Sequence, residues 1–582
     1  MRKLIATLGF GLYSALTILP LGAQGRLAPD LARPNRAHGQ LVDVIVQYRS
    51  GAFLPVHSRI TARGGNWKRH LEMIGAAVYS VPVNALDLIA ADPDVTLISP
   101  DRPVHATTFS GSADYGWMTV LDLSSNTAAL ALDGTGIGVA VIDSGITPSA
   151  DFQGAKGQSR IVYQQNFVPN PTGANDQYGH GTHVAGILGG NGSDSTGPQY
   201  SYTIRGTAPN VDLLDLRVLD QNGESTDSTA IAAIEAAIQL KSRYNVRVIN
   251  LSLGRPISVS YKDDPLCQAV EQAWKAGIVV VVAAGNGGRD NSSGTNGYGT
   301  ITAPANDPYV ITVGAMNTMD TLTRTDDKIT SYNSKGPSAI DHVVKPDLVA
   351  PGNRILSLAA VGSYLATTYP ANDVPKSVYH KGNSPVTGTY FQLSGTSMAA
   401  PMVSGAAALM LQKDPTLTPD LVKARLMKTA SKFVQPYSVA TDPVTSIRYT
   451  SYYDIFTIGA GYLDVQAALA NTETLTGSTL SPEAVYDQST GTVLIVGATS
   501  AAWGNSAAWG NSVVWGTNAL AANSAAWGNS AAWGNSAAWG SSAAWGNGTP
   551  YGLSAIWGNQ PVSDTGTTVD SEAAAVAING ED

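Results

Sequence analysis

The segment Gly277 to Asn286 constrains the fold more than any other part of the chain. It reads Gly-Ile-Val-Val-Val-Val-Ala-Ala-Gly-Asn, a continuous run of mostly β-branched and small residues. A run without polar alternation is expected for a strand buried on both faces, and such strands belong mainly to parallel sheets covered by helices. The run ends in a glycine turn that carries a side-chain amide, Asn286.

Strands and helices alternate through the middle of the chain, as a doubly wound α/β sheet requires. A threonine followed by proline, Thr418-Pro419, predicts the start of a further helix. The predicted strands are 138–142, 211–218, 246–253 and 309–314, and the predicted helices are 229–240, 397–412 and 465–469.

Ser397 is the first candidate for catalytic chemistry. It follows a glycine in Gly-Thr-Ser and opens a helical run of small residues. At a helix N-terminus, unpaired backbone N–H groups can stabilise an oxyanion that forms beside the serine. The alternative is a serine that only caps the helix, because serine is a favoured N-cap.

A base and a carboxylate precede this serine in the sequence. His180 lies between glycines at the start of an apolar helix, and Asp143 follows the predicted strand 138–142. Strand ends and helix starts of this kind can meet at one edge of a parallel sheet. A histidine there can take the serine proton while the aspartate fixes its tautomer.

The segments around Asp143, His180 and Ser397, in that order, resemble the signature segments of the subtilisin-like serine peptidases, the subtilases. The resemblance covers residues 114–469 and implies a subtilisin-like doubly wound parallel sheet. It also implies that Ser397 is the nucleophile, His180 the general base and acid, and Asp143 the orienting carboxylate. By the same resemblance Asn286 donates to the oxyanion, the alternative being an ordinary turn residue.

The resemblance also implies where substrate binds. Ser252, Leu253 and Gly254 would form one wall of the pocket for the residue before the scissile bond, and Ala283, Ala284 and Gly285 the other. Both walls are small and uncharged, which favours hydrophobic side chains in that pocket. The alternative is that these glycines serve only strand packing.

Two further residues near the predicted triad are ambiguous. His183 lies three residues after His180, a spacing that metal ligands also use, but no third ligand accompanies the pair and a structural histidine is predicted. Asp176 either shapes a substrate subsite or is a solvated loop residue. No cofactor is expected for catalysis. The resemblance implies structural calcium, with no metal ligands assignable from the sequence.

Composition excludes some classes of function. The chain has 582 residues and a net charge of −9, which argues against nucleic-acid binding. Its single cysteine, Cys267, cannot form an internal disulfide and is predicted to be a core residue of a helix.

The N-terminus predicts secretion. Arg2 and Lys3 precede an apolar stretch, so residues 1–23 are interpreted as a signal peptide, with a retained membrane anchor as the alternative. No other segment is long and apolar enough to span a bilayer, so no stable membrane span is expected after signal cleavage. A linker, 24–40, follows.

Residues 41–106 resemble the small α+β propeptide of secreted subtilases. Strands are predicted at 41–48, 77–81 and 95–98, and Asn84 is predicted to cap a helix over 85–91. Such a propeptide assists folding and inhibits its own enzyme, which would otherwise act on protein or peptide substrates. Self-cleavage is expected within 106–114.

The remaining chain is divided into a catalytic domain at 107–470, a linker at 471–499, a repeat region at 500–558 and an acidic tail at 559–582. Within the catalytic domain, 353–393 is predicted to add a loop near the active site.

The repeat region consists of copies of the hexapeptide Ser-Ala-Ala-Trp-Gly-Asn. An even period keeps every ring on one face of an extended chain, which favours a β-solenoid-like array, with disorder as the alternative. The rings are either the core of that array or a surface that contacts cell-wall polysaccharide, and an adhesive protein built on the repeats is the alternative to an active peptidase. The tryptophans are Trp503, Trp509, Trp515, Trp527, Trp533, Trp539, Trp545 and Trp557, with Ala521 and Tyr551 at the two gaps.

Overall fold

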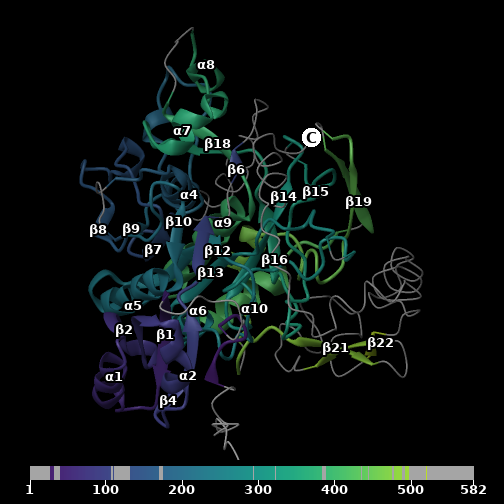
Figure 1. Cartoon of the computed structure of the whole chain (residues 1–582). Coiled ribbons are helices and arrows are strands. Elements are labelled where there is room, and N and C mark those ends of the chain that lie inside the picture. The colour runs from purple at the N-terminus through teal and green to yellow at the C-terminus, as the bar shows by residue number, and fades with distance from the viewer. Residues whose placement is uncertain are drawn as a thin grey trace, which may run out of the picture. The chain divides into compact units, whose positions relative to one another are not determined.

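The structure is a computed structural model in which the chain forms two compact units, residues 1–100 and 101–582 (Figure 1). The predicted signal peptide and, apart from Ala519–Leu520, the repeat region lie outside the residues that the structure describes. The described residues are 26–31, 40–106, 109–110, 132–169, 175–292, 294–321, 323–382, 388–433, 435–442, 445–474, 477–487, 492–496 and 519–520.

The N-terminal unit is an antiparallel sheet of order β2-β3-β1-β4 with two α-helices. Alternate residues of β1, Val44 and Val46, pack with Val56 of α1 and Ile89 of α2 in one hydrophobic core. The elements are β1 (Leu41–Tyr48), α1 (Phe53–Ala62), β2 (Asn66–Leu71), β3 (Ala76–Pro82), α2 (Leu86–Ala90) and β4 (Val95–Pro100).

The structure confirms the three strands predicted in this unit and corrects the predicted helix cap. A 3₁₀ turn, Val83–Ala85, precedes α2, so Asn84 lies inside that turn and the α-helix begins at Leu86 without a side-chain cap. Strand β2 was not predicted, because its sequence Asn-Trp-Lys-Arg-His-Leu has no apolar alternation.

The second unit is built on an eight-stranded sheet. Its path runs β15-β14-β13-β11-β7-β9-β8, with β16 paired to β14, and all pairs are parallel except β14 with β15. The predicted doubly wound parallel sheet is therefore confirmed. Its strands are β7 (Gly138–Asp143), β8 (Ile161–Asn166), β9 (Asp212–Arg217), β11 (Val246–Leu251), β13 (Val279–Ala283), β14 (Ile311–Asn317), β15 (Lys328–Ile329) and β16 (Leu348–Pro351).

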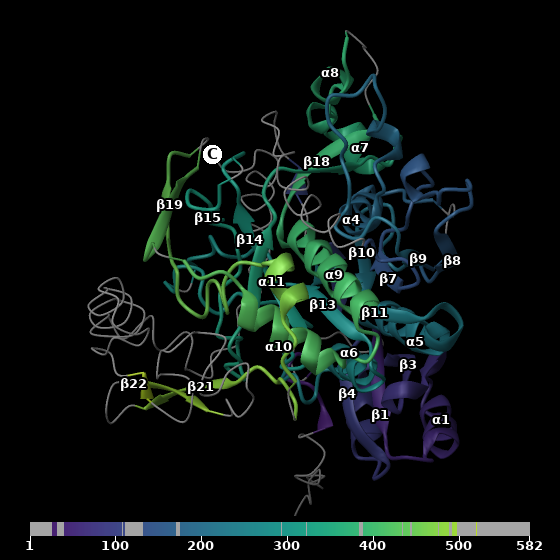
Figure 2. The same cartoon turned by 180° about the vertical axis from the view of Figure 1, so that it is seen from behind.

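Helices cover this sheet and bury its central strands. Every residue of β7 and β13 is buried, as the β-branched run predicted. Helix α9 packs on β11, β13 and β14 and against α4, and Figure 2 shows α9, α10 and α11 in front of the strands. Helices α5 and α6 pack against each other and on β11 and β13. The helices are α4 (His180–Gly189), α5 (Asp227–Tyr244), α6 (Pro265–Lys275), α9 (Thr396–Lys413), α10 (Pro419–Thr429) and α11 (Val465–Ala470).

Two local predictions about these helices are confirmed. Thr418 Oγ1 accepts from the backbone N–H of Leu421 at 3.2 Å and so caps α10. Cys267 is fully buried in α6, where burial raises the pKa of its thiol well above the usual value. None of the helices that the structure describes is long and apolar enough to cross a membrane.

The stretch 353–393 was predicted as a loop, but its described residues, 353–382 and 388–393, include strands and helices. Strands β17 (Ile355–Leu358) and β18 (Tyr390–Ser394) pair as an antiparallel hairpin, and helices α7 (Tyr364–Thr368) and α8 (Lys376–Tyr379) lie between them. Figure 1 shows both helices projecting beyond β18. The sequence pattern did not predict this hairpin, because its strands are only four and five residues long and the insertion is rich in Tyr, Ser, Thr and Pro.

The C-terminal part of the unit adds short strands. One pair of strands forms a hairpin, β19 (Tyr437–Thr441) and β20 (Arg448–Tyr452). Three more form a small sheet, β21 (Glu483–Asp487), β22 (Thr492–Val496) and β23 (Ala519–Leu520). Strands β21 and β22 fall inside the predicted linker 471–499.

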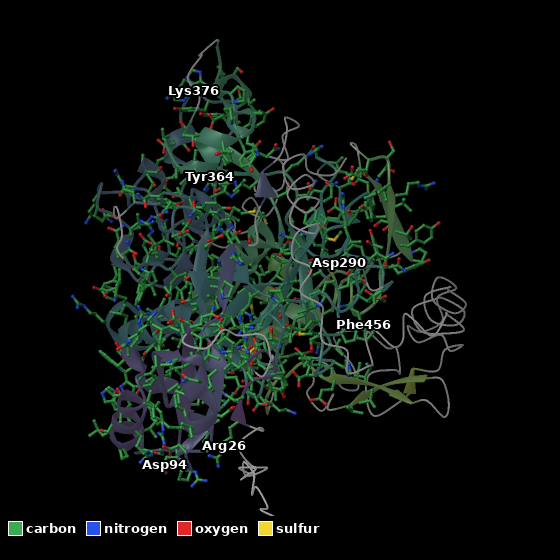
Figure 3. The ribbon with its side chains drawn as sticks, in the orientation of Figure 1. Arg26, Asp94, Asp290, Tyr364, Lys376 and Phe456 are labelled. Atoms are coloured by element: carbon green, nitrogen blue, oxygen red, sulfur yellow. The ribbon has the colours of Figure 1, made fainter. Side chains whose placement is uncertain are left out.

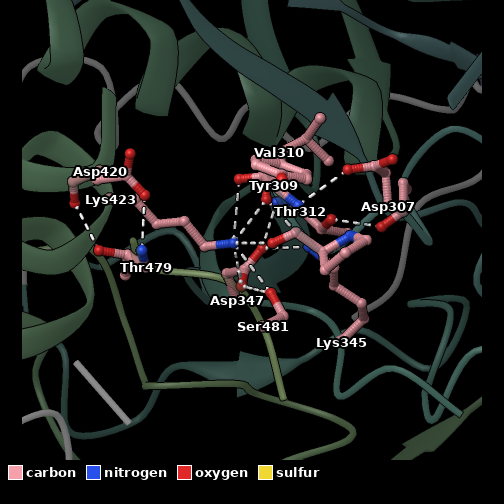
Figure 4. Close-up of polar contacts among 12 residues, drawn as sticks. Asp307, Tyr309, Val310, Thr312, Lys345, Asp347, Asp420, Lys423, Thr479 and Ser481 are labelled. Atoms are coloured by element: carbon pink, nitrogen blue, oxygen red, sulfur yellow. Dashed lines mark hydrogen bonds and ion pairs between the residues drawn. The ribbon is translucent and has the colours of Figure 1, made fainter. Parts of the chain in front are cut away.

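A buried ionic cluster fastens this C-terminal segment to the main sheet (Figure 4). The carboxylate of Asp347 accepts from Lys345 at 2.8 Å and from the Ser481 hydroxyl at 2.7 Å, and Lys423 lies 3.1 Å away. Lys423 Nζ also donates to the carbonyls of Pro308 and Val310, both at 2.9 Å. Burial lowers the pKa of Lys423 to about 7, and the contact with Asp347 opposes that shift.

The cluster predicts that Lys423→Met destabilises the protein by about 3 kcal/mol or more, because removing one partner leaves a buried carboxylate and carbonyls poorly paired. Urea unfolding of full-length chain in a Ser397→Ala background, which removes the predicted nucleophile, measures this loss. Lys428→Met is the matched control on α10, since the Lys428–Glu473 ion pair is partly exposed and should contribute no more than about 1 kcal/mol. Equal, small losses for both variants would contradict a structural role for the cluster.

Candidate active site

The three predicted catalytic residues come from three element ends. Asp143 is the last residue of β7, His180 the first of α4 and Ser397 the second of α9. Both helices begin after a glycine with positive φ, Gly179 at 103° and Gly395 at 145°. A Cβ on Gly179 would lie 2.4 Å from Ser363 Oγ, so this turn requires glycine for space as well as for conformation.

His180 and Asp143 form a buried hydrogen-bonded pair. His180 Nδ1 lies 2.6 Å from Asp143 Oδ1, which also accepts from the backbone N–H of Ser144 at 2.7 Å. The carboxylate therefore holds the proton on Nδ1 and leaves Nε2 as the acceptor. Nε2 is buried and has no hydrogen-bond partner among the residues that the structure describes. The imidazole can accept a proton only at Nε2.

Ser397 is held against Ser252. Its Oγ donates to the Ser252 carbonyl at 3.1 Å, and the Ser252 hydroxyl donates to the Ser397 carbonyl at 3.0 Å. Proton transfer to His180 requires the Ser397 hydroxyl to turn away from Ser252, as catalytic hydrogen bonds often tighten only when substrate is bound. Ser252, predicted as a wall residue, therefore also positions Ser397, the predicted nucleophile.

Asn286 is oriented by Thr396, the residue before Ser397. Its Oδ1 accepts from the backbone N–H of Thr396 at 3.0 Å and from the Thr396 hydroxyl at 3.1 Å. Because Thr396 binds Oδ1, the Nδ2 group at the other end of the amide points away from Thr396. The role of Thr396 was missed from the sequence, although it lies in the Gly-Thr-Ser turn.

Asp176 is buried, which corrects its alternative interpretation as a solvated loop residue. Its carboxylate accepts from the backbone N–H groups of Gly179 at 2.7 Å and Thr182 at 2.8 Å, and from the Ser144 hydroxyl at 2.8 Å. Burial raises the pKa of this carboxyl, and these hydrogen bonds oppose the shift. Asp176 therefore ties the Asp143–Ser144 turn to the start of α4.

His183 has the surroundings of a structural histidine. Its Nε2 lies 3.1 Å from the Ile355 carbonyl and 3.0 Å from the Phe391 carbonyl. Burial, and to a smaller degree His180, lower the pKa of His183 to about 3, so the ring is neutral at physiological pH. Across the described ranges no group of three or more His, Cys, Asp or Glu is arranged to hold a metal ion. The calcium implied by the resemblance stays a prediction.

Both predicted substrate walls lie against Thr302, which was not among the predicted site residues. A Cβ on Gly254 would lie 2.6 Å from Thr302 Oγ1, and a Cβ on Gly285 would lie 2.8 Å from Thr302 Cγ2. The backbone N–H of Thr302 donates to the Ala284 carbonyl at 3.2 Å. Glycine at both positions lets the walls approach one threonine side chain. Nothing in the local sequence of Thr302 signals this contact.

One wall pairs with an extended segment of the chain itself. Strand β5 (Pro103–Ala106) lies between β12 (Leu253–Gly254) and β10 (Glu224–Thr226), antiparallel to both. Within β5 the side chain of Val104 is buried and His105 is exposed. Strand β6 (Phe109–Ser110) pairs with the end of β18, directly before Gly395. Strand β5 therefore pairs with the strand that follows Ser252, and β6 with the strand that precedes Gly395.

This geometry is that of a nucleophilic serine hydrolase. It supplies a serine at a helix start, a histidine whose tautomer a buried carboxylate fixes, and an oriented amide donor, which acyl transfer requires. The edges of β10 and β12 pair with β5, an extended segment of the chain itself, in the way that peptides are recognised by main-chain pairing.

The comparisons define the family. The sequence profile of the Subtilase family matches residues 134–451, more than half of the chain. The chain belongs to the subtilase family.

Characterised relatives and a solved structure agree with this assignment. Serine protease AprX of Bacillus subtilis is 39% identical over 312 residues, which cover 52% of this chain and 63% of that protein. Subtilisin E of Bacillus subtilis is 32% identical over 410 residues, which cover 70% of this chain and 84% of that protein. The chain thus spans less than two thirds of AprX and most of subtilisin E. Fervidolysin from Fervidobacterium pennivorans, a keratinolytic enzyme related to subtilisin, has a similar fold, with a TM-score of 0.55 and 21% identity over 77% of this chain and 64% of that chain.

The orientation of Asn286 predicts that Asn286→Ala lowers kcat about 100- to 1000-fold with little change in KM, a magnitude established for the corresponding donor in subtilisin. Thr396→Val removes one of the two hydrogen bonds to Oδ1 and should lower kcat about fivefold, because one such bond is worth about 1 kcal/mol. Thr396→Ser keeps both bonds and serves as the control. Steady-state kinetics on a peptide substrate measures all three. An Asn286→Ala enzyme with unchanged kcat would exclude Asn286 from the oxyanion site.

Proposed function

We propose that this chain is a secreted serine endopeptidase that hydrolyses peptide bonds through an acyl-enzyme on Ser397. The observation that carries the proposal is the buried hydrogen bond of 2.6 Å between Asp143 and His180, which leaves Nε2 as the acceptor of the imidazole. Family membership supports it. Secretion is supported by the apolar N-terminal stretch after Arg2 and Lys3.

The mechanism follows from these atoms. Ser397 gives its proton to His180 Nε2 while its Oγ bonds to the substrate carbonyl carbon, and Asp143 stabilises the imidazolium. Asn286 Nδ2 and the backbone N–H of Ser397 stabilise the oxyanion. His180 then protonates the leaving amine, the C–N bond breaks, and an acyl-enzyme remains. Water, deprotonated by His180, releases the acid and restores the serine.

Strand pairing on both sides of the nucleophile supports an endopeptidase. A substrate in the register of β5 pairs its residues with Gly254 and Leu253, and β6 pairs with Ser394 on the other side. Main-chain pairing on both sides favours cleavage within a chain over removal of a terminal residue.

The same strands support processing of a precursor by its own active site. Strand β5 ends at Ala106 and β6 begins at Phe109, so we place the self-cleaved bond between these two residues, with Thr107–Thr108 the central bond. This interval lies inside the predicted window 106–114. The uncut segment would occupy the substrate-binding edges and so inhibit the enzyme.

Wild type and Ser397→Ala, expressed with the signal peptide in a host that lacks extracellular proteases, should differ in mass. Wild type should yield a mature chain that begins between residues 107 and 109, whereas Ser397→Ala should keep its propeptide, because the cut needs the serine nucleophile. N-terminal sequencing and intact mass measure both. As a control, mature wild-type protein is added to the Ser397→Ala precursor to show that the precursor can still be cut. Identical maturation of the two chains alone would refute self-processing.

The small, uncharged walls support a preference for hydrophobic side chains before the scissile bond. Leu253 and Ala284 are apolar and Thr302 carries no charge, so nothing among them can pair with a basic side chain. Self-cleavage is less selective, because a tethered segment has a high effective concentration.

A peptide library that varies this position should therefore give kcat/KM values for Leu, Met and Phe at least tenfold above those for Arg and Lys. The margin reflects the cost of burying an unpaired cation between these walls. Mature protein and its Ser397→Ala variant are profiled side by side to subtract contaminating activity. A strong preference for Arg or Lys would contradict the proposed specificity and leave the catalytic assignment intact.

A further inference from the structure

Tyr178 lies between the catalytic histidine and the strand edge that pairs with β5. Its ring centroid is 6.4 Å from that of His180. A Cβ built on Gly223, directly before β10, would lie only 2.7 Å from Cε1 and Cζ of Tyr178. The tyrosine ring therefore covers Gly223, and any larger residue at 223 would displace it.

Gly223 is also a contact of the strand bound at this edge. Its carbonyl accepts from the backbone N–H of Ala106 at 3.1 Å. Side chains alternate along a strand, so Ala106 shares a face with Val104, which is buried. The side chain at the Ala106 position is therefore directed toward the body of the domain, and the hydrogen bond to Gly223 brings this position close to the residue that the Tyr178 ring covers.

The insertion that carries α7 fixes Tyr178 in place. The ring of Tyr364 stacks on that of Tyr178 with centroids 5.9 Å apart and planes 15° apart. The backbone N–H of Leu365 donates to the Tyr178 carbonyl at 3.0 Å, and that of Tyr364 donates to the Gln177 carbonyl at 2.8 Å. Tyr364 is about half exposed, and Figure 3 shows it near α7. The stacking opposes rotation of the Tyr178 ring, and the two backbone hydrogen bonds hold its segment against the insertion.

The register of β5 defines which substrate residue meets this ring. Ala106 pairs with Leu253, so in a substrate bound in the same register the next residue lies opposite Ser252. The carbonyl of Ser252 is 3.1 Å from Ser397 Oγ, which puts the bond to be cut directly after that next residue. The Ala106 position is then the second residue before the scissile bond.

We propose that Tyr178, held by Tyr364 of the insertion, is the wall of the subsite for the second residue before the scissile bond and restricts that residue to small side chains. This inference rests on the proposed endopeptidase activity. The chain's own residue at the position is alanine, which fits the restriction. The insertion thus acts as a specificity element.

Two peptide substrates that differ only at this position, alanine against leucine, test the proposal on mature protein. Wild type should prefer alanine at least tenfold in kcat/KM, and Tyr178→Ala should lower that ratio at least tenfold by accelerating cleavage of the leucine peptide. Tyr364→Ala should lower the ratio by a smaller factor, because the ring of Tyr178 remains but loses its support. Tyr178→Phe keeps the ring and should keep the ratio.

Tyr437→Ala is the matched control. Tyr437 is an exposed tyrosine beside another tyrosine ring, Tyr452, on the β19–β20 hairpin, and its loss should leave the ratio unchanged. An unchanged ratio in an active Tyr178→Ala enzyme would overturn the proposal. If Tyr178→Ala does not fold, Tyr364→Ala provides the test, because the half-exposed side chain of Tyr364 can be removed without opening the core. An unchanged ratio in Tyr364→Ala would then overturn the proposal. Hydrolysis of the alanine peptide by wild type and not by Ser397→Ala tests the peptidase activity separately.

Discussion

The constraint on which the rest depends is that the central parallel strands are buried on both faces. Strands β7 and β13 expose no residue, so polar groups cannot lie along them and occur where the strands end. Parallel strands end at a common edge, which brings Asp143 and Asn286 to the same side of the sheet. Helices that cover the sheet must start near that edge, and their first turns carry His180 and Ser397.

A layer of hydrogen bonds behind these four residues determines their orientation. Asp176 joins the Asp143 turn to α4, Thr396 holds the amide of Asn286, and Ser252 holds Ser397. These contacts are 2.8 to 3.0 Å long, within the range of ordinary hydrogen bonds. Because acyl transfer loses rate steeply when reacting groups move by about 1 Å, the supporting residues matter for catalysis without touching substrate.

Part of this could be predicted from the sequence and part could not. Continuous apolar runs gave the strands, and glycine-flanked motifs gave Asp143, His180, Ser397 and Asn286, because each signal lies within about ten residues. Thr302 and Tyr178 lie against residues distant in sequence, Gly254 and Tyr364, so no local pattern marks them. The insertion was predicted as a loop for the same reason: its strands are short, and pairing across more than 30 residues stabilises them.

The most direct test of the account is covalent labelling of the mature protein with a fluorophosphonate, followed by peptide mapping. Such a reagent phosphonylates a serine hydroxyl that a neighbouring base activates, so it reports the nucleophile without any assumption about substrate. We expect one modified residue per chain, Ser397, and loss of labelling in His180→Ala. Labelling of a different serine, or labelling of Ser397 that persists in His180→Ala, would contradict it.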